Sequence, residues 1–387
     1  MPLRHATDDR NSPGFGTPLG FCAVPVERMN REQFYAKLTP FDEERLRKVL
    51  WNLYWRGSAQ LRKRIEGEME PAERDRRRRS PAEPPDPGAV LDEVRDFVQL
   101  ARSGAYIAGD RRVSPAERTR WRVTFRWLAT DAQSALRAED ADPAEEALSL
   151  IIDLAREMGD YNYFRSEDPV EAARFVVSGA ASALWQSMRS RHGFRIFAER
   201  AAAQLVKWES RYGWTRGWGQ LGDKETTLAS VLARMLPAPD MWTAFADCYL
   251  DALDEVAPAT TAKAKSREYS DAGAFCRRRT DALAEWHELL LGSLAGSDVE
   301  DRLDRLTRHP ALAGPELTFL QARLAYHRGD LERARTLAHD CLEELPGHHY
   351  FAGFAAEIGA EFPPRAREIA DEVARREAAQ ATAGGPG

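Results

Sequence analysis

Apolar residues recur along this chain with the spacing of helices. From residue 39 onward they stand three or four positions apart, so that each run places its hydrophobic side chains on one face of an α-helix. Runs in which apolar and polar residues alternate, as they do in half-buried strands, are missing from the sequence. The pattern therefore predicts an all-α fold.

Prolines mark where several helices begin. Four segments place a short polar residue before proline and a glutamate three positions after that residue, which is the pattern of a helix N-cap and capping box. These segments are 80–83, 114–117, 142–145 and 168–171, and each of the last three precedes a strongly apolar run. Further helices are expected at 194–209, 224–236, 240–256, 271–295, 298–308, 315–328, 331–345, 350–358 and 364–378.

Shifts in composition divide the chain into regions. Residues 1–28 are rich in proline and glycine and have no apolar period, and 71–88 combine four consecutive arginines with five prolines. Neither segment is able to form a core, so we expect the ordered protein to begin at Met29. The predicted regions are a flexible leader (1–28), an N-terminal helix pair (29–70), an Arg/Pro-rich linker (71–88), a helical domain (89–256), a polar loop (257–270), helical repeats (271–378) and a disordered tail (379–387).

The segment 315–351 carries a family pattern. Its small residues, turn and terminator stand where a helix hairpin needs them, at Ala322, Gly329, Asp330, Ala334 and Pro346. This pattern resembles a tetratricopeptide repeat, a hairpin about 34 residues long. It departs from that family early in the first helix, where Thr318 replaces an aromatic residue. The resemblance implies a degenerate α-solenoid, or helical-repeat array, whose stacked hairpins form a concave surface.

Composition narrows the class of protein. Hydrophobic residues make up 43% of the chain, which is enough to bury a core. The four cysteines lie far apart without a C-x-x-C motif, which fits a reducing, cytoplasmic location. No apolar run approaches ~18 residues, so we expect no contact with a membrane. Of the 55 basic residues 48 are arginine, the bias of a GC-rich bacterial genome, so arginine content by itself does not indicate nucleic-acid binding.

Charge is distributed unevenly along the chain. Residues 1–80 carry 17 basic and 12 acidic side chains, a net charge of +5, and since the whole chain is −6, residues 81–387 are −11. This basic N-terminal region is either a contact for nucleic acid or an acidic partner, or a solvated linker. A second basic feature is a row at helical spacing that either grips phosphates or lines a solvated flank: Arg118, Arg122 and Arg126, with Arg111 and Arg112 nearby.

The segment 207–226 is unusually rich in tryptophan and glycine. Its residues 217–222 match G-x-G-x-x-G, but they follow a helix rather than a strand, which argues against dinucleotide binding. We interpret the segment as a candidate binding loop, because aromatic rings beside arginines stack on bases or clamp a peptide. The alternative is that the tryptophans fold back into the core. The candidate residues are Glu209, Arg211, Trp214, Arg216 and Trp218.

A second loop, 160–169, offers Tyr161, Tyr163 and Arg165 as candidate ligand-binding residues on the same concave surface. The alternative is an ordinary connection whose aromatic rings close the end of the core. An acidic row follows at Asp247, Asp251 and Asp254. Carboxylates at this spacing bind cations, but solvated acidic faces are common, and we favour a solvated face.

These observations favour a helical-repeat protein that binds or scaffolds a protein or peptide partner. The first alternative is a nucleic-acid-binding protein that uses the basic N-terminal region and the arginine and tryptophan side chains. The second is an enzyme with an all-α site built from Arg165, Glu209, Arg211, Arg216 and Asp223. Known catalytic signatures are missing from the sequence, which favours binding over catalysis. The sequence predicts no catalytic residue, metal ligand or cofactor.

Overall fold

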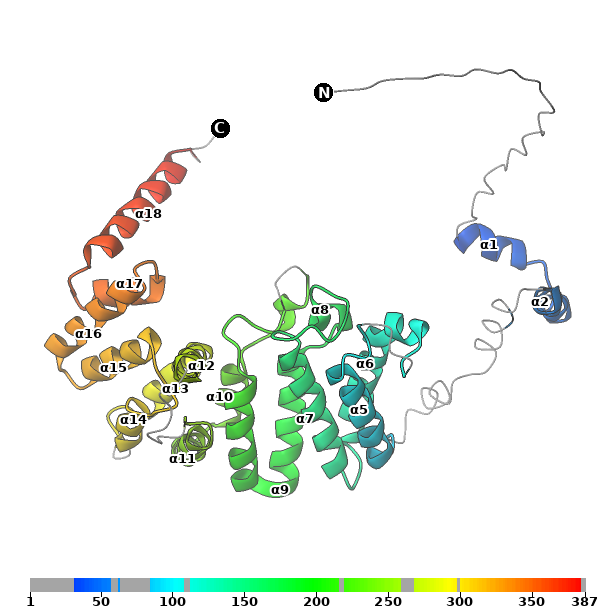
Figure 1. Cartoon of the computed structure of the whole chain (residues 1–387), viewed down its shortest axis with the longest axis horizontal. Helices are drawn as coiled ribbons and strands as arrows, with labels where there is room; N and C mark the ends of the chain where they lie inside the picture. The colour runs from blue at the N-terminus through cyan, green and yellow to red at the C-terminus, as the bar shows by residue number, and fades with distance from the viewer. Residues whose placement is uncertain are drawn as a thin grey trace, which may run out of the picture. The chain divides into compact units, whose positions relative to one another are not determined.

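The computed structural model describes residues 31–56, 62, 84–107, 112–215, 219–258, 268–297 and 300–383. The chain divides into two compact units, Met1–Pro81 and Ala82–Gly387. Over the described residues the regular elements are helices and no strand occurs (Figure 1), so the predicted all-α class is confirmed. The predicted leader, most of the linker and the central part of the polar loop lie outside the described residues. No helix among those described combines the length and apolarity needed to cross a bilayer.

The first unit contains α1 (Arg31–Leu38) and α2 (Glu43–Arg56). The start of α2 follows from its sequence, because the Asp42 carboxylate accepts a hydrogen bond from the Arg45 amide over 2.8 Å. No side chain of α2 is buried, and Trp55 is 69% exposed while it stacks on Trp51. The described part of this unit therefore has no closed hydrophobic core.

The second unit has its main core among the helices that follow the linker. Helix α7 (Asp142–Glu157) packs between α5 (Pro87–Arg102) and α9 (Val177–Trp208), and α9 contacts α10 (Leu228–Met235) and α11 (Pro239–Glu255) (Figure 1). Helix α6 (Pro115–Ala135) packs on α5 and α7. The same core continues into α13 (Ala284–Leu294) and α14 (Asp301–Leu306). Its largest fully buried side chains include Trp185, Trp208 and Trp286.

A second, smaller hydrophobic cluster lies toward the C-terminus. It is built from α15 (Pro315–His327), α16 (Leu331–Glu344), α17 (His349–Glu357) and the start of α18 (Pro364–Ala383). Helix α12 (Glu268–Ala282) packs on α13 and α15, next to the boundary between the clusters. Since burying a large apolar side chain contributes about 1.5–3 kcal/mol, the first and larger cluster supplies most of the stabilisation of this unit.

Helices α15 and α16 form a hairpin over the segment with the repeat pattern. Gly329 has a φ of +77°, a conformation that glycine adopts without a Cβ penalty, and it ends the first helix. The Asp330 side chain caps α16 by accepting a bond from the Arg333 amide. Ala322 and Ala334 are both 0% exposed, and their small side chains let the two backbones approach closely. The segment is a helix hairpin, and its membership of the tetratricopeptide family stays a prediction.

Three of the predicted N-terminal signals fall in described residues, and they behave differently. Ser114 caps α6 and forms the complete capping box with Glu117. Asp168 caps the short α8 (Pro169–Ala173), but Glu171 accepts a bond from the Leu221 amide instead of closing the box. The prediction for 142–145 is wrong, because α7 has Ala141 and not Asp142 as its N-cap residue, and no side chain caps the helix. The side chains of both Asp142 and Glu145 turn toward α9 instead, as described below. The fourth signal, 80–83, lies outside the described residues.

Two predicted helices are broken in the structure. The run that begins at Asp168 stops after α8 at Arg174, which adopts φ +53°. A new helix then starts at Val177, because the Glu225 carboxylate accepts bonds from the amides of Val177 and Ser178 over 2.6 and 3.0 Å. The predicted helix 271–295 is divided at Leu283 into α12 and α13.

The ends of two predicted regions also differ. Helix α5 begins at Pro87, inside the predicted linker, with Asp86 as its cap. Helix α18 continues to Ala383, so the first residues of the predicted disordered tail are helical.

Candidate functional site

A groove of about 730 Å³ opens where the two hydrophobic clusters of the second unit meet. Its volume is in the range of sites that bind ligands in proteins. One wall comes from α15 and α17. The other comes from the end of α9, the N-cap of α10 and the first turn of α13.

The α15–α17 wall follows from helical periodicity. Residues three, four and seven positions apart share one face of a helix. Glu316, Phe319, Leu320 and Arg323 of α15 have this spacing and line the groove. Tyr350, Gly353, Phe354 and Glu357 of α17 repeat the same spacing.

Aromatic side chains form the apolar part of the groove. The ring centroids of Phe319 and Phe351 lie 4.7 Å apart, and Phe319 meets Phe354 edge to face at 5.5 Å. Phe351 and Phe354 are buried in the second cluster, which fixes their position. Tyr350 is 63% exposed, so its ring remains available beside this apolar part.

Arg211 connects the two walls. Its guanidinium pairs with Asp281, lies 3.6 Å from a Glu316 oxygen, and is 2.7 Å from His348 Nε2. A guanidinium donates and does not accept, so this nitrogen of His348 is the acceptor and the ring is neutral. Burial, with the nearby Arg211 charge, lowers the pKa of His348 and keeps it neutral.

Arg323 is engaged in a similar way. Its guanidinium lies 5.1 Å from the centre of the Phe354 ring and 6.0 Å from that of Phe319. It also forms an ion pair with Glu288, with 3.4 Å between nitrogen and oxygen. Both arginines of the groove therefore already have anionic or aromatic partners.

Glu209 is the most deeply buried acid of the groove, at 4% exposed. Its two oxygens accept hydrogen bonds from the amides of Ser210 (2.9 Å) and Ala229 (2.7 Å), which joins the end of α9 to the first turn of α10. Burial raises the pKa of Glu209 to about 7 in spite of these bonds. With both oxygens in use, Glu209 is held as a structural acceptor.

The other acids of the groove are more accessible. Glu285 is exposed and accepts bonds from the hydroxyls of Thr227 (2.8 Å) and Ser230 (2.7 Å). Burial raises the pKa of Glu288, and Arg323 opposes that rise. Burial also raises the pKa of Glu316. Glu357 is the fifth glutamate of the lining, which also contains two arginines.

Two residues of the predicted tryptophan loop, Glu209 and Arg211, line this groove. Trp214 is 9% exposed, and its indole N–H donates to the Trp208 carbonyl over 3.0 Å. At Trp214 the arrangement matches the alternative in which a tryptophan folds back into the core. Arg216 and Trp218 lie outside the described residues.

The predicted loop at 160–169 does not contribute to the groove lining. Tyr163 donates to Glu157 over 3.1 Å, and Tyr161 stacks on Tyr163 with centroids 5.8 Å apart. Arg165 donates to the Ile107 carbonyl over 3.0 Å. Arg165 and Asp223, two members of the hypothetical enzyme site, thus do not join Glu209 and Arg211 in the groove.

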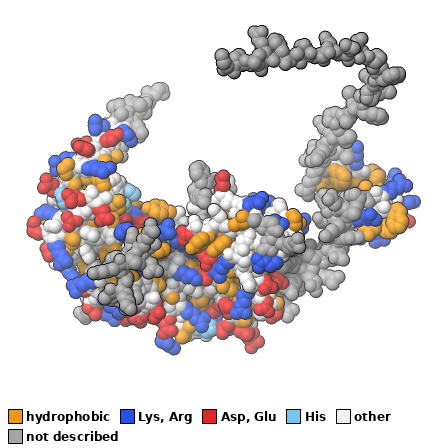
Figure 2. All heavy atoms as spheres, in the orientation of Figure 1, with side chains coloured by type: hydrophobic (Ala, Val, Ile, Leu, Met, Phe, Trp, Pro, Cys, Tyr) orange, Lys and Arg blue, Asp and Glu red, His pale blue; other side chains and the backbone are white. Residues whose placement is uncertain are grey.

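The predicted basic row is partly used by the fold. Arg126 donates to the Ala173 carbonyl over 3.0 Å, which ties α6 to α8, and Arg112 contacts Ser103 over 3.2 Å. Arg122 is exposed and Arg118 is half-buried, while Arg111 lies outside the described residues. On the face shown in Figure 2, basic and acidic side chains are interspersed over the second unit rather than segregated.

The predicted acidic row of α11 forms ion pairs with α14. Asp247 holds Arg302 with two hydrogen bonds of 2.7 and 2.8 Å, and Asp254 pairs with Arg305 and lies 3.0 Å from His309. The row stays largely exposed, with side-chain exposures of 49%, 76% and 54%, as expected for the solvated face that the sequence favoured, and its carboxylates also connect two helices.

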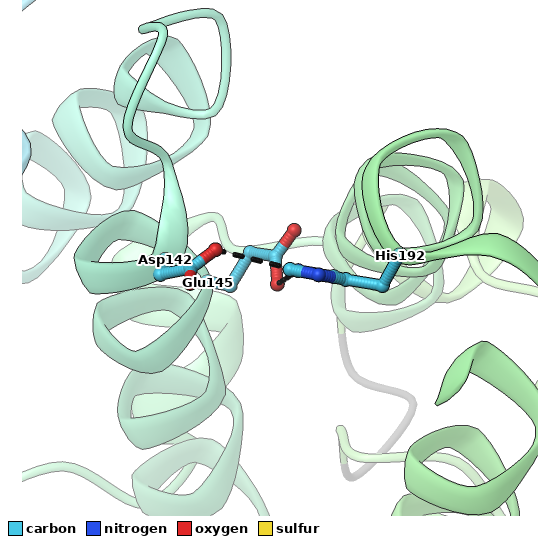
Figure 3. Close-up of side chains that lie close together, drawn as sticks. All are labelled: Asp142, Glu145 and His192. Atoms are coloured by element: carbon cyan, nitrogen blue, oxygen red, sulfur yellow. Dashed lines mark hydrogen bonds and ion pairs between the residues drawn. The ribbon is translucent and has the colours of Figure 1, made fainter.

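A second polar cluster combines Asp142, Glu145 and His192 (Figure 3). The His192 Nε2 atom lies 3.2 Å from Glu145 and 3.3 Å from Asp142, and Glu145 is 2% exposed. Two carboxylates and an imidazole are donor groups that a divalent metal accepts, so we tested whether they fit one.

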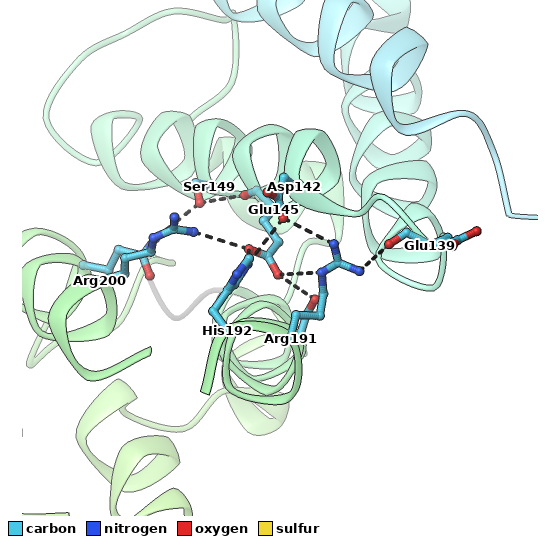
Figure 4. Close-up of polar contacts among 9 residues, drawn as sticks. Glu139, Asp142, Glu145, Ser149, Arg191, His192 and Arg200 are labelled. Atoms are coloured by element: carbon cyan, nitrogen blue, oxygen red, sulfur yellow. Dashed lines mark hydrogen bonds and ion pairs between the residues drawn. The ribbon is translucent and has the colours of Figure 1, made fainter. Parts of the chain in front are cut away.

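The surrounding arginines argue against a metal. Arg191 lies 3.4 Å from the same Asp142 oxygen that faces His192, and Arg200 lies 3.6 Å from the same Glu145 oxygen (Figure 4). Two guanidinium charges already balance the two carboxylates, so an added divalent cation would leave an excess of positive charge beside the buried Glu145.

This cluster instead supports a bend in α9. Gly193 has φ +78° and ψ 177°, values that interrupt the helix. Glu145 binds Ser187 and His192 before the bend and Arg200 after it. From the sequence, Glu145 is predicted to close a capping box. Its actual partners lie more than 40 positions away, and no spacing in the linear sequence indicates them.

Comparisons with protein-family models, curated proteins and solved structures find no match to this chain. Its function is therefore argued from the geometry of the groove.

Proposed function

We propose that this protein is a binding module that recognises a protein or peptide segment in the groove between the two hydrophobic clusters. The observation that carries the proposal is the wall formed by α15 and α17, where two helices present matching faces to one groove. In a helical-repeat array, stacked hairpins leave such faces available for ligands. The degenerate solenoid and the tetratricopeptide-like repeat are parts of this proposal.

The chemistry of the groove suits a peptide. Aromatic rings offer an apolar contact for a side chain, and charged groups surround them. Helical and extended peptides are recognised by grooves that combine apolar pockets with polar groups at defined places. Tyr350 adds an exposed aromatic ring of the kind enriched in binding hot spots.

A protein partner is favoured over nucleic acid. Nucleic-acid binding depends on cations that neutralise phosphates, whereas Arg211 and Arg323 are already paired with acids. Residues 81–387, which contain the groove, have a net charge of −11 by sequence. The three described cysteines are free thiols, which supports a cytoplasmic location as part of the proposal.

The experiment is a selection of displayed random peptides on the full-length protein. Gly353→Trp is the blocked variant, because a Cβ at Gly353 meets no atom within 4 Å and the new ring projects into the groove. Gly292→Trp in α13 is the matched control, since Gly292 has equal space around it and does not line the groove.

We expect selected peptides to bind the parent and Gly292→Trp equally, and to lose binding to Gly353→Trp. Circular dichroism verifies that both variants keep the helical content of the parent. Peptides that bind all three proteins alike would place the binding surface elsewhere. Retention of single-stranded DNA, with affinity that falls steeply from about 50 to 200 mM salt, would favour the nucleic-acid alternative.

A further inference from the structure

We propose that the segment bound in the groove is cationic, with a lysine or arginine next to an apolar side chain. This inference rests on the proposed function of the groove and assigns the chemistry of its partner.

The charge balance of the lining gives the sign of the ligand. Apart from the buried Glu209, four glutamates and two arginines line the groove, and the histidines among them are neutral or exposed. Asp281, which pairs with Arg211, adds a further negative charge next to the lining. The excess of carboxylates makes the groove attractive to cations and repulsive to acidic segments.

Neither arginine is available for an anionic ligand. Arg211 is shared among Asp281, Glu316 and His348, so a ligand carboxylate would have to replace one of them. Arg323 is held between Glu288 and two aromatic rings. An acidic peptide would bring its charge next to Glu288 and Glu316 without gaining a free cation.

Three side chains are placed to receive a cation. Among the described residues no lysine or arginine forms an ion pair with Glu285 or Glu357, and both glutamates are exposed. Each of these glutamates therefore has carboxylate charge available to a ligand. The exposed ring of Tyr350 lies on the same face of α17 as Glu357, about two turns earlier, and offers a surface for a cation–π contact.

The apolar part of the ligand follows from the rings next to these acids. Phe319, Leu320 and Phe354 line the same groove, and their contacts fix them in place. A leucine or phenylalanine beside the ligand cation would cover these apolar side chains. Such a segment both neutralises the carboxylates of the groove and covers its apolar side chains. A polyanion would not do the first, and a purely apolar helix would do only the second.

The test measures the affinity of short fluorescein-labelled peptides for the full-length protein by fluorescence anisotropy. The probe peptide contains alternating lysine and serine residues, with leucine and phenylalanine residues placed at intervals between them. Two matched peptides replace each lysine with glutamine or with glutamate. Measurements at about 150 mM salt keep long-range attraction screened, because the Debye length there is about 8 Å.

We expect the lysine peptide to bind at least about tenfold more tightly than the glutamine peptide, and the glutamate peptide to bind most weakly. Gly353→Lys, which places a positive charge in the groove, should weaken the lysine peptide at least about tenfold, whereas Gly353→Glu should not weaken it. Gly292→Lys makes the same charge change outside the groove and should leave the affinity within about twofold of the parent.

The outcomes separate this inference from the proposed function. If the glutamine or glutamate peptide binds as tightly as the lysine peptide and Gly353→Trp abolishes binding, the groove binds peptides but the cationic ligand is wrong. If Gly292→Lys weakens binding as much as Gly353→Lys does, the attraction comes from the general acidity of the chain and the site is wrong. If no peptide of either the selection or this set binds, both proposals fail.

Discussion

The Arg211 guanidinium donates a hydrogen bond of 2.7 Å to Nε2 of His348 and so joins the turn after α9 to the N-cap of α17. Arg211 lies between Trp208 and Trp214 of the main hydrophobic cluster, and His348 precedes the helix that carries Phe351 and Phe354 of the second cluster. This bond therefore helps to set the distance between the two walls of the groove.

Replacing Arg211 with methionine should cost about 1–3 kcal/mol of unfolding free energy, because Asp281 and Glu316 then lose their cation while they stay partly buried. A double-mutant cycle with His348→Leu isolates the bond between the two side chains. We expect a coupling of about 1 kcal/mol in urea titrations. Strict additivity of the two substitutions would show that this bond contributes nothing.

His287 should make stability fall in acid. It is fully buried beside Tyr249, 2.8 Å from the phenol oxygen, and burial lowers the pKa of His287 to about 3. An unfolded histidine titrates near a pKa of about 6.5. The unfolded state therefore binds the proton first, and this contribution to stability is present above pH ~6.5 and lost progressively as pH falls toward the folded pKa.

The measurement is the unfolding free energy in urea between pH 8 and pH 4, compared for the parent and His287→Gln. The variant should show a shallower decline below pH ~6.5. Equal slopes for the two proteins would contradict a neutral, buried His287. Glu209 acts in the opposite direction, since burial raises its pKa to about 7, so the slopes of parent and variant are compared instead of read singly.

Binding of the lysine peptide should strengthen as pH rises from about 5.5 to 8. A cation prefers ionised carboxylates, and burial raises the pKa values of Glu288 and Glu316, so both ionise later than ordinary glutamates. Around Glu288 the other charged groups are Arg323 and His327, and around Glu316 they are Asp281, Arg211 and Glu344. Anisotropy titrations across this range give the trend, and affinity that falls with rising pH would contradict it.

Removing the carboxylate of Glu145 should destabilise the bend in α9. In Glu145→Ala the side chains of His192, Arg191 and Arg200 lose their shared anion, and we expect a loss of about 2–3 kcal/mol, less than for a fully buried pair because the arginines are partly exposed. Thermal melts with and without excess Zn²⁺ test the same cluster for a metal. Unchanged melting of the parent is the expected result, and a marked rise in Tm with zinc would identify a metal site after all.

The hairpin of α15 and α16 gives a further test of packing. Ala334→Leu should cost about 1–3 kcal/mol by overpacking a fully buried position. Gly329→Val should cost a comparable amount, about 1–3 kcal/mol, because φ at this position is +77° and a valine backbone is strained there. A Cβ at Gly329 meets no atom within 4 Å, so the cost comes from the backbone alone. Melting of both variants at the temperature of the parent would contradict the close-packed hairpin.

Local signals account for the parts of the fold that the sequence predicted well. The turn at Gly329 and the cap at Asp330 need only neighbouring residues, and both are found in the structure. The errors arise where a distant side chain decides the backbone. Glu225 starts α9 from 48 positions away, and Glu145 leaves its predicted cap for partners on α9. Neither contact has a signature in the linear sequence.

The same reasoning applies to the groove. Glu209 and Arg211 stood out in a segment rich in aromatic residues, and both line the groove. Tyr350, Gly353 and Glu285 carry no such signal, because each has the sequence context of an ordinary helical residue, and the groove forms only where five segments of the chain converge. Periodicity predicts which residues share a helix face, but the position of α17 across the groove from the first turn of α13 depends on how the two clusters pack.

Hydrogen–deuterium exchange on the full-length protein, with and without the lysine peptide, tests the groove as the binding site most directly. Bound peptide should slow exchange in α15, in α17 and in the segments at 209–211 and 284–288, and should leave α5 and α7 unchanged. Protection that appears on α5–α7 while α15 and α17 exchange at their free rates would contradict binding in the groove.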